Sequence, residues 1–162
     1  MKKITTLCII HNHPQILLGM KKKGFGKGRW NGFGGKVKKE ETIEEGIKRE
    51  LFEESKLDVP IDNFEKVGII EFSFKEIPDI LENHFFKVKN FSGEPYETEE
   101  MKPRWFHIDE IPFNQMWTDD VCWMSLFLEG KKFRGKFVFD RPSSENYSSK
   151  IIKRFIEEVD SL

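Results

Sequence analysis

The chain has 162 residues, a length that suits one domain with a buried core, so we expect a single domain over residues 1–162. Charged residues make up 34% of it, yet the formal net charge is only −1, which argues against binding of a nucleic-acid polymer through its phosphates. With two cysteines and no run of about 20 apolar residues, we expect a soluble cytoplasmic protein without a membrane partner.

The chain is expected to begin with two strands and a glycine-rich loop. The apolar segments Ile4–Ile10 and Gln15–Met20 predict strands that are joined by a turn at His13-Pro14. Glycines are frequent between Lys21 and Gly35, and glycine permits close approach of the backbone to a neighbouring group. We therefore expect this loop to serve a site rather than only to connect elements.

A helix is expected over residues 42–57. Thr42 is a suitable N-cap, and Glu45 three residues later completes a capping box. The apolar residues of this segment form one stripe, made by Ile43, Ile47, Leu51 and Leu57.

The second half of the chain predicts mainly strands. Expected strands cover Val67–Phe74, His84–Val88 and Arg104–Ile108, an expected helix covers Trp117–Leu128, and a hairpin is expected from Lys131–Phe133 and Phe137–Phe139 with its turn at Gly135. In the tail, Ile151, Phe155 and Val159 recur at the spacing of a helix, but the segment is β-branched enough to form an edge strand. Strands at both ends around a middle helix indicate an α+β fold.

Three glutamates form the strongest chemical signal in the sequence. Glu50, Glu53 and Glu54 are spaced i, i+3 and i+4, which places them on one face of the expected helix. They could be an ordinary solvated face. As a group, however, they repel one another, and a divalent cation would reverse that repulsion. Carboxylate oxygens in this number suit Mg²⁺, for which Mn²⁺ can substitute.

The residues around these glutamates complete a longer pattern. Gly35, Glu41 and Arg49 precede them at the spacing G-x5-E-x7-R-E-U-x-E-E-x-x-U, which ends at Leu57. Residues 35–57 resemble the Nudix box, the signature of the Nudix hydrolases. The departure is Lys56, which stands where the pattern has glycine; it would adopt a left-handed conformation at a cost of about 1 kcal/mol, or the helix would extend.

The resemblance extends over nearly the whole chain and is to those Nudix enzymes that hydrolyse oxidised purine nucleoside triphosphates. It rests on the segments 19–37, 100–106, 111–113 and 117–120, and on the spacing of the residues from Phe133 to Phe139. It implies the Nudix fold, a mixed β-sheet sandwiched between helices, in which the tail is a strand. The match is loose between Lys75 and Asn83, and we expect that stretch to border the pocket and to influence substrate preference.

The resemblance also implies the residues of the site. Implied metal ligands are the backbone oxygen of Gly34 and the side chains of Glu50, Glu53, Glu54 and Glu100. Implied catalytic residues are Glu50, Glu53, Glu54 and Arg49, with Arg49 expected to orient a neighbouring glutamate through a bidentate pair. Implied substrate contacts are Thr6, Lys21, Asn31, Phe33, Phe72, Trp117, Asp119 and Asp120.

Several of these residues also have a purely structural interpretation. Trp117 could belong to the core, and Asn31 could be a turn residue. Asp119 and Asp120 could cap the helix that follows, or they could meet the edge of a base. In a poorly solvated pocket one of the two carboxyls should hold a proton near neutral pH, whereas the helix dipole opposes this. The sequence leaves these alternatives open.

We expect a magnesium-dependent enzyme in which activated water attacks the triphosphate and Glu53 or Glu50 acts as the base. By resemblance, substrates such as 8-oxo-dGTP and 2-hydroxy-dATP would yield the monophosphate and pyrophosphate, which removes damaged precursors before they enter DNA. The alternatives are a Nudix enzyme for another nucleoside diphosphate derivative, or a non-catalytic nucleotide-binding module. We expect a monomer.

Overall fold

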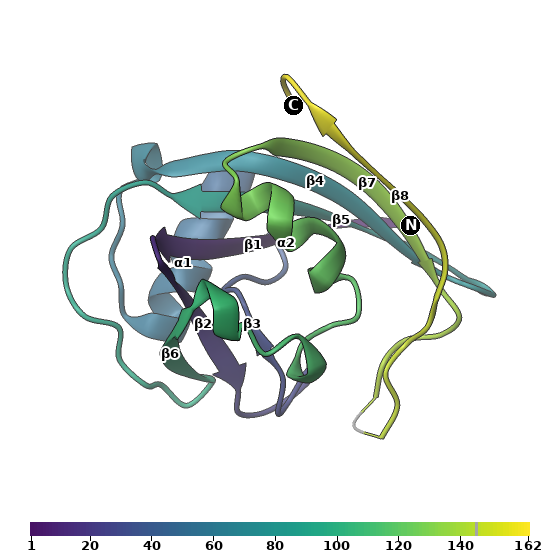
Figure 1. The fold of residues 1–162 in the computed structure, drawn as a ribbon, viewed down its shortest axis with the longest axis horizontal. Helices are drawn as coiled ribbons and strands as arrows, with labels where there is room; N and C mark the ends of the chain where they lie inside the picture. The colour runs from purple at the N-terminus through teal and green to yellow at the C-terminus, as the bar shows by residue number, and fades with distance from the viewer. Residues whose placement is uncertain (145) are drawn as a thin grey trace.

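The computed structural model describes residues 1–144 and 146–162. In this part of the chain eight strands form one sheet, and two α-helices pack against it (Figure 1). The strands are β1 (Lys2–Asn12), β2 (Gln15–Lys21), β3 (Trp30–Asn31), β4 (Phe64–Phe74), β5 (Ile77–Val88), β6 (Met101–His107), β7 (Lys132–Phe139) and β8 (Ile151–Val159). The helices are α1 (Ile43–Ser55) and α2 (Asp120–Leu128). Among the described residues no helix has the length and apolarity needed to span a membrane.

The sheet is mixed, as the resemblance implied. Its order is β3-β2-β1-β5-β4-β7-β8, and β6 pairs with β2 beside this path. The pairs β1–β5 and β4–β7 are parallel, and the other pairs are antiparallel. The long central strands therefore come from both halves of the chain.

The two helices cover opposite faces of the sheet. Successive side chains of a strand point to opposite faces. Leu7 and Ile9 of β1 belong to the core cluster that includes α2, whereas Cys8 and Ile10 belong to the cluster that includes α1. The expected arrangement of a sheet between helices is confirmed.

Helix α1 begins and ends as its sequence predicts. Both hydrogen bonds of the capping box between Thr42 and Glu45 are present. At its other end Lys56 adopts the left-handed conformation, with φ 66° and ψ 11°, and its N–H donates to the carbonyl of Phe52 at 2.8 Å. Lysine thus takes the conformation that the glycine of the pattern would take, and the helix does not extend.

Some predicted elements were wrong. The expected hairpin with a turn at Gly135 is one continuous strand, β7, which pairs with β4 along its length. Phe133, Gly135 and Phe137 are all buried and alternate with exposed Arg134 and Lys136, so the glycine lies in the core-facing row. An added Cβ there would lie 2.8 Å from the carbonyl oxygen of Phe155 on β8. Close packing against β8, and not a turn, therefore explains the glycine at this position.

The boundaries of other elements also differ from the prediction. The ambiguous tail is the strand β8, paired with β7, so its helical interpretation was wrong. Strand β5 begins at Ile77, seven residues before the predicted start at His84, because it lies between β1 and β4 and pairs with both. Helix α2 begins at Asp120 rather than at Trp117.

Candidate active site

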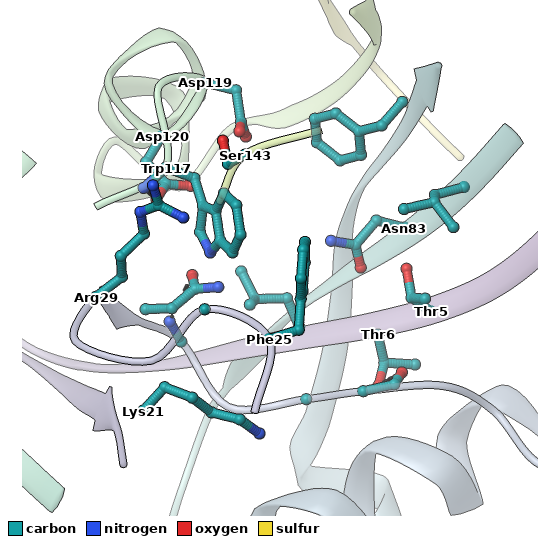
Figure 2. Close-up of a pocket in the computed structure, with 18 of the residues that line it drawn as sticks. Thr5, Thr6, Lys21, Phe25, Arg29, Asn83, Trp117, Asp119, Asp120 and Ser143 are labelled. Carbon is teal, nitrogen blue, oxygen red and sulfur yellow. Dashed lines mark hydrogen bonds between the residues drawn. The ribbon is translucent and has the colours of Figure 1, made fainter. Parts of the chain in front are cut away.

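One pocket is lined by most of the residues that the sequence indicated, although Glu50 and Glu53 are not among them. Its volume is about 740 Å³, within the range of small-molecule sites. It lies on the face of the sheet that α2 covers and is bordered by the glycine-rich loop (Figure 2). The expected site residues in its lining are Thr6, Lys21, Asn31, Gly34, Glu54, Phe72, Glu100, Trp117, Asp119 and Asp120.

Phe33 does not line this pocket. Its side chain is completely buried in the cluster that packs against α1. Its backbone N–H and carbonyl both bond to Cys8, at 2.9 and 2.6 Å. The side chain of Phe33 thus helps to fix the loop on β1, and the structure does not bring it to the substrate pocket.

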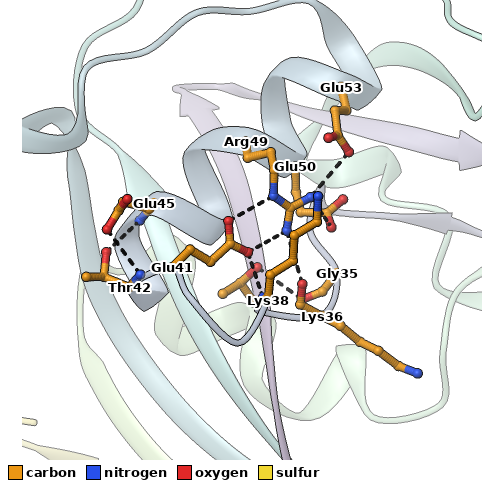
Figure 3. A network of polar contacts seen from close by, with 10 residues as sticks. Gly35, Lys36, Lys38, Glu41, Thr42, Glu45, Arg49, Glu50 and Glu53 are labelled. Atoms are coloured by element: carbon orange, nitrogen blue, oxygen red, sulfur yellow. Dashed lines mark hydrogen bonds and ion pairs between the residues drawn. The ribbon is translucent and has the colours of Figure 1, made fainter.

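Arg49 organises the polar end of the site (Figure 3). It makes the expected bidentate pair, with Glu41: Nε donates to Oε2 at 3.0 Å and Nη2 to Oε1 at 2.6 Å. This contact lowers the pKa of Glu41 to about 2. Nη1 also donates to Glu50 at 3.0 Å and to Glu53 at 3.3 Å. The arginine therefore joins the glutamate of the loop to two glutamates of α1.

Glu54 connects these glutamates to the pocket. Its side chain is only 3% exposed, and its Oε1 accepts the N–H of Gly34 at 2.9 Å. Lys21 is the nearest cation, with Nζ 3.9 Å from Oε2. Burial raises the pKa of Glu54 to about 8, and the negative charges of Glu50 and Glu100 add to the rise.

Two glycines allow the loop to approach so closely. A Cβ on Gly34 would lie 1.9 Å from the carbonyl oxygen of Thr6, and a Cβ on Gly35 would lie 2.6 Å from a carboxylate oxygen of Glu50. A side chain at Gly34 would push the loop away from the backbone of β1, and a side chain at Gly35 would displace the Glu50 carboxylate. Both glycines are therefore explained by close packing at the site itself.

The glutamate cluster fits a hard divalent cation in donor type and charge. Burial raises the pKa of Glu50, and the charges of Glu53 and Glu100 raise it further. The cluster is thus short of positive charge, and oxygen ligands of this kind suit Mg²⁺ or Mn²⁺. Among the described residues, no three acidic, histidine or cysteine side chains converge on one point as ligands. Two of the expected ligands, Glu50 and Glu53, instead accept hydrogen bonds from Arg49.

The other end of the pocket is aromatic. Trp117 stacks with Phe25 at a centroid distance of 5.1 Å, and the guanidinium of Arg29 lies 4.4 Å from the Trp117 ring centroid. Gly26 has φ +87°, and a Cβ there would lie 3.1 Å from the Trp117 ring. Trp117 therefore borders the pocket rather than filling the core, and its environment suits a flat ligand.

Asp119 and Asp120 are buried beside this aromatic group. Asp119 accepts the Nε1–H of Trp123 at 3.0 Å, and Asp120 accepts the backbone N–H of Trp117 at 3.1 Å. Burial raises the pKa of Asp119 to about 6 and raises that of Asp120 well above its usual range, where the charge of Asp119 adds to the effect. Both shifts have the direction expected of carboxyls in a poorly solvated pocket, which favours a proton on the pair.

The sequence did not single out several other lining residues. Phe25 and Arg29 belong to the glycine-rich loop, and their contacts with Trp117 join segments about 90 residues apart. Leu81 and Asn83 fall in the divergent stretch that was expected to border the pocket, and both line it. Phe139 and Thr5 also line it. Thr5, Leu81, Asn83 and Phe139 come together only because β1, β4, β5 and β7 pair in the sheet.

Comparisons with known proteins identify relatives of the chain. The family model described as the NUDIX domain matches residues 1–127. The chain is 48% identical over 160 residues to the oxidized purine nucleoside triphosphate hydrolase of Mus musculus, and the match covers 98% of this chain and 97% of that protein. The protein of the same name from Danio rerio is 46% identical, and the match covers 99% of this chain and 97% of that protein. A crystal structure of a MutT protein from Bacillus halodurans superposes with a TM-score of 0.77 at 27% identity, and the match covers 96% of this chain and 97% of that one.

Proposed function

The chain belongs to the Nudix family, and from this premise we propose that it hydrolyses oxidised purine nucleoside triphosphates to the monophosphate and pyrophosphate. One observation carries the proposal. A buried glutamate from the helix of the Nudix box and an aromatic recess with two buried aspartates line the same cavity. That cavity offers a place for a polyphosphate at one end and for a base at the other.

Nudix enzymes typically use a divalent metal ion. Here we propose that Mg²⁺ is held by Glu50, Glu53, Glu54, Glu100 and the backbone oxygen of Gly34, with Mn²⁺ able to substitute. The ion would supply positive charge to the polyphosphate and help to ionise the attacking water.

The protein groups then have separate tasks. Lys21 points its ammonium group into the pocket beside Glu54 and would bind a phosphate oxygen. Arg49 holds Glu50 and Glu53 in place through its bonds to both. Glu53 has the more exposed carboxylate, at 44% against 14% for Glu50, so it has the better access to water and we propose it as the general base.

The base would stack on Trp117 and meet the two aspartates. Their shared proton allows the pair to present both a donor and an acceptor. Asn31 lines the same cavity and could add its amide, while Phe72 contributes to the apolar wall. Thr6 lies at the polar end, where its hydroxyl donates to the carbonyl of Gly35 at 3.3 Å.

We further propose that residues 1–162 act as one Nudix domain and that the enzyme is a monomer with the nucleotide as its partner. In support, β7 and β8 lie beyond residue 127, where the family match ends, yet they complete the same sheet. Light scattering during size-exclusion chromatography measures the mass directly; a dimer would contradict this part of the proposal.

Hydrolysis of 8-oxo-dGTP, 2-hydroxy-dATP and dGTP, followed through release of pyrophosphate, and of NADH, followed through release of AMP, each with Mg²⁺, tests the main proposal. We expect the oxidised purine triphosphates to be hydrolysed with the highest kcat/KM. Preference for NADH would instead indicate a Nudix enzyme for dinucleotides. Tight binding of 8-oxo-dGTP with no hydrolysis of any of the four would indicate a binding module.

A further inference from the structure

The Asn83 side chain lines the pocket and has no hydrogen-bond partner among the described residues. Its Oδ1 atom is buried and accepts no bond there. Its amide nitrogen, which points into the pocket in Figure 2, makes no bond in the described chain either. A polar group that makes no hydrogen bond costs stability. The amide nitrogen is therefore available as a donor to a ligand in the pocket.

The position of Asn83 in the sheet makes the unpaired amide more unusual. It lies on β5 between Leu81 and Phe85, which point to the same face and pack in the core cluster around α2. An apolar side chain would continue this row and would leave no polar group unsatisfied. Because an asparagine interrupts the row exactly where it lines the pocket, packing alone does not account for it.

A second polar group lies beside it. Thr5 of β1 is the register partner of Asn83 in the parallel β1–β5 ladder, and both residues line the pocket. Figure 2 shows the Asn83 amide turned toward the pocket with Thr5 next to it, while Asp119 and Asp120 approach from another side. The Thr5 hydroxyl, like the amide, bonds to no other group in the described chain.

We infer that Asn83 and Thr5 form a second polar subsite of the pocket, which bonds to an oxygen of the bound nucleoside and so contributes to specificity. The inference rests on the proposed function, because the nucleoside must enter this cavity. The shared chemistry is an oxygen that accepts the N–H of the Asn83 amide. Two parts of the ligand can supply it: the carbonyl oxygen that oxidation at C8 places on the guanine ring, or a hydroxyl of the sugar.

Two variants and a matched control isolate the subsite. Asn83→Leu keeps the size of the side chain and removes its hydrogen-bonding groups, and Thr5→Val does the same for the threonine. Asn114→Leu makes the same chemical change on an exposed turn that does not line the pocket. Binding of the monophosphates 8-oxo-dGMP, 8-oxo-GMP and dGMP by calorimetry is the measurement, since it needs neither metal nor turnover.

We expect Asn83→Leu to weaken binding of at least one of the three roughly 10-fold, the size of one hydrogen bond to a ligand. Thr5→Val should have a smaller effect, and Asn114→Leu none. A loss for both 8-oxo nucleotides but not for dGMP would assign the contact to the oxidised base. A loss only for 8-oxo-GMP would assign it to the 2′-hydroxyl, and an equal loss for all three would assign it to a sugar hydroxyl that they share.

The stability of the unliganded protein gives a second, independent readout. Because its amide is unpaired, replacing Asn83 by leucine should leave the Tm unchanged or raise it. A lower Tm together with unchanged dissociation constants for all three nucleotides would mean that Asn83 is structural and would overturn the inference. Unchanged constants at an unchanged Tm would overturn it as well. If the wild-type protein binds and hydrolyses no oxidised nucleotide, the proposed function itself fails, which the wild-type data reveal before any variant is compared.

Discussion

The two ends of the pocket are built in different ways. The glutamate end is built mainly from the contiguous segment 34–54, where Arg49 pairs with Glu41, Glu50 and Glu53, and Lys21 and Glu100 join it. The aromatic end is assembled from β1, β4, β5, β7, the glycine-rich loop and the start of α2. There Asp119 and Asp120 are buried, and in the described part of the chain they form no ion pair.

The two ends are therefore expected to have different tasks, catalysis at the glutamate end and recognition of the base at the aromatic end. At the glutamate end several carboxylates lie close together and can attract an ion. At the aromatic end two carboxyls are buried beside flat apolar surfaces, and burial raises their pKa. A change at the first end should therefore act mainly on turnover, whereas a change at the second should act mainly on binding and on its dependence on pH.

The largest effect is expected from Glu53→Gln. Loss of a general base typically costs at least about 100-fold in rate, and we expect kcat for 8-oxo-dGTP to fall by that factor while the fold survives. The matched control is Glu44→Gln, on the same helix, where the side chain is 43% exposed compared with 44% for Glu53. Steady-state kinetics and circular dichroism measure both; near-normal turnover would remove Glu53 from the mechanism.

Trp117→Ala tests the aromatic end. Stacking on an aromatic side chain contributes about 1–3 kcal/mol for a base, so kcat/KM for 8-oxo-dGTP should fall roughly 10- to 100-fold, mainly through KM. Trp105→Ala, at a tryptophan outside the pocket, controls for general destabilisation. If the loss appeared in kcat with KM unchanged, the division of tasks between the two ends would be incorrect.

Asp120→Asn tests the role of burial through the stability of the protein. The pKa of Asp120 is raised in the folded state, so the folded protein keeps a proton that the unfolded chain releases. Below about pH 4, the pKa of an aspartate in the unfolded chain, the wild-type carboxyl therefore does not lower the free energy of unfolding. As the pH rises above that pKa, the carboxyl destabilises the folded protein increasingly. Asparagine retains an oxygen for the Trp117 N–H and removes this penalty.

We expect the free energy of unfolding of Asp120→Asn, relative to wild type, to rise by about 1–3 kcal/mol between pH 4 and pH 8. Denaturant titrations at several pH values measure it. For the control Asp62→Asn, at an exposed position, the free energy of unfolding should vary with pH in parallel with that of the wild type. Parallel curves for Asp120→Asn itself would show that the carboxyl is not destabilised by burial.

The smallest effect is expected at the end of α1. Lys56→Gly removes a left-handed lysine, which costs about 1 kcal/mol, but it also removes the cation–π contact in which Lys56 Nζ lies 5.3 Å from the Phe52 ring centroid. We expect a net stabilisation of about 0.5 kcal/mol with unchanged kcat and KM. A marked loss of activity would mean that Lys56 takes part in the site rather than only closing the helix.

The sequence by itself determined the local features of this protein. The capping box of α1, the spacing of its glutamates, the bidentate pair of Arg49 and the left-handed turn at Lys56 all depend on residues less than about ten positions apart. Their geometry follows from the period of a helix and the conformations of its ends. For the same reason the α+β class and the grouping of Glu50 and Glu53 beside Arg49 could be predicted.

The tertiary structure decided what depends on distant segments. Gly135 looked like a turn because its pairing with β4 and β8 cannot be recognised locally. Phe33 looked like a pocket residue, yet it packs on the opposite face of the sheet. The raised pKa values of Asp119 and Asp120 and the unpaired amide of Asn83 likewise depend on burial, which arises only when strands far apart in the chain pack against one another.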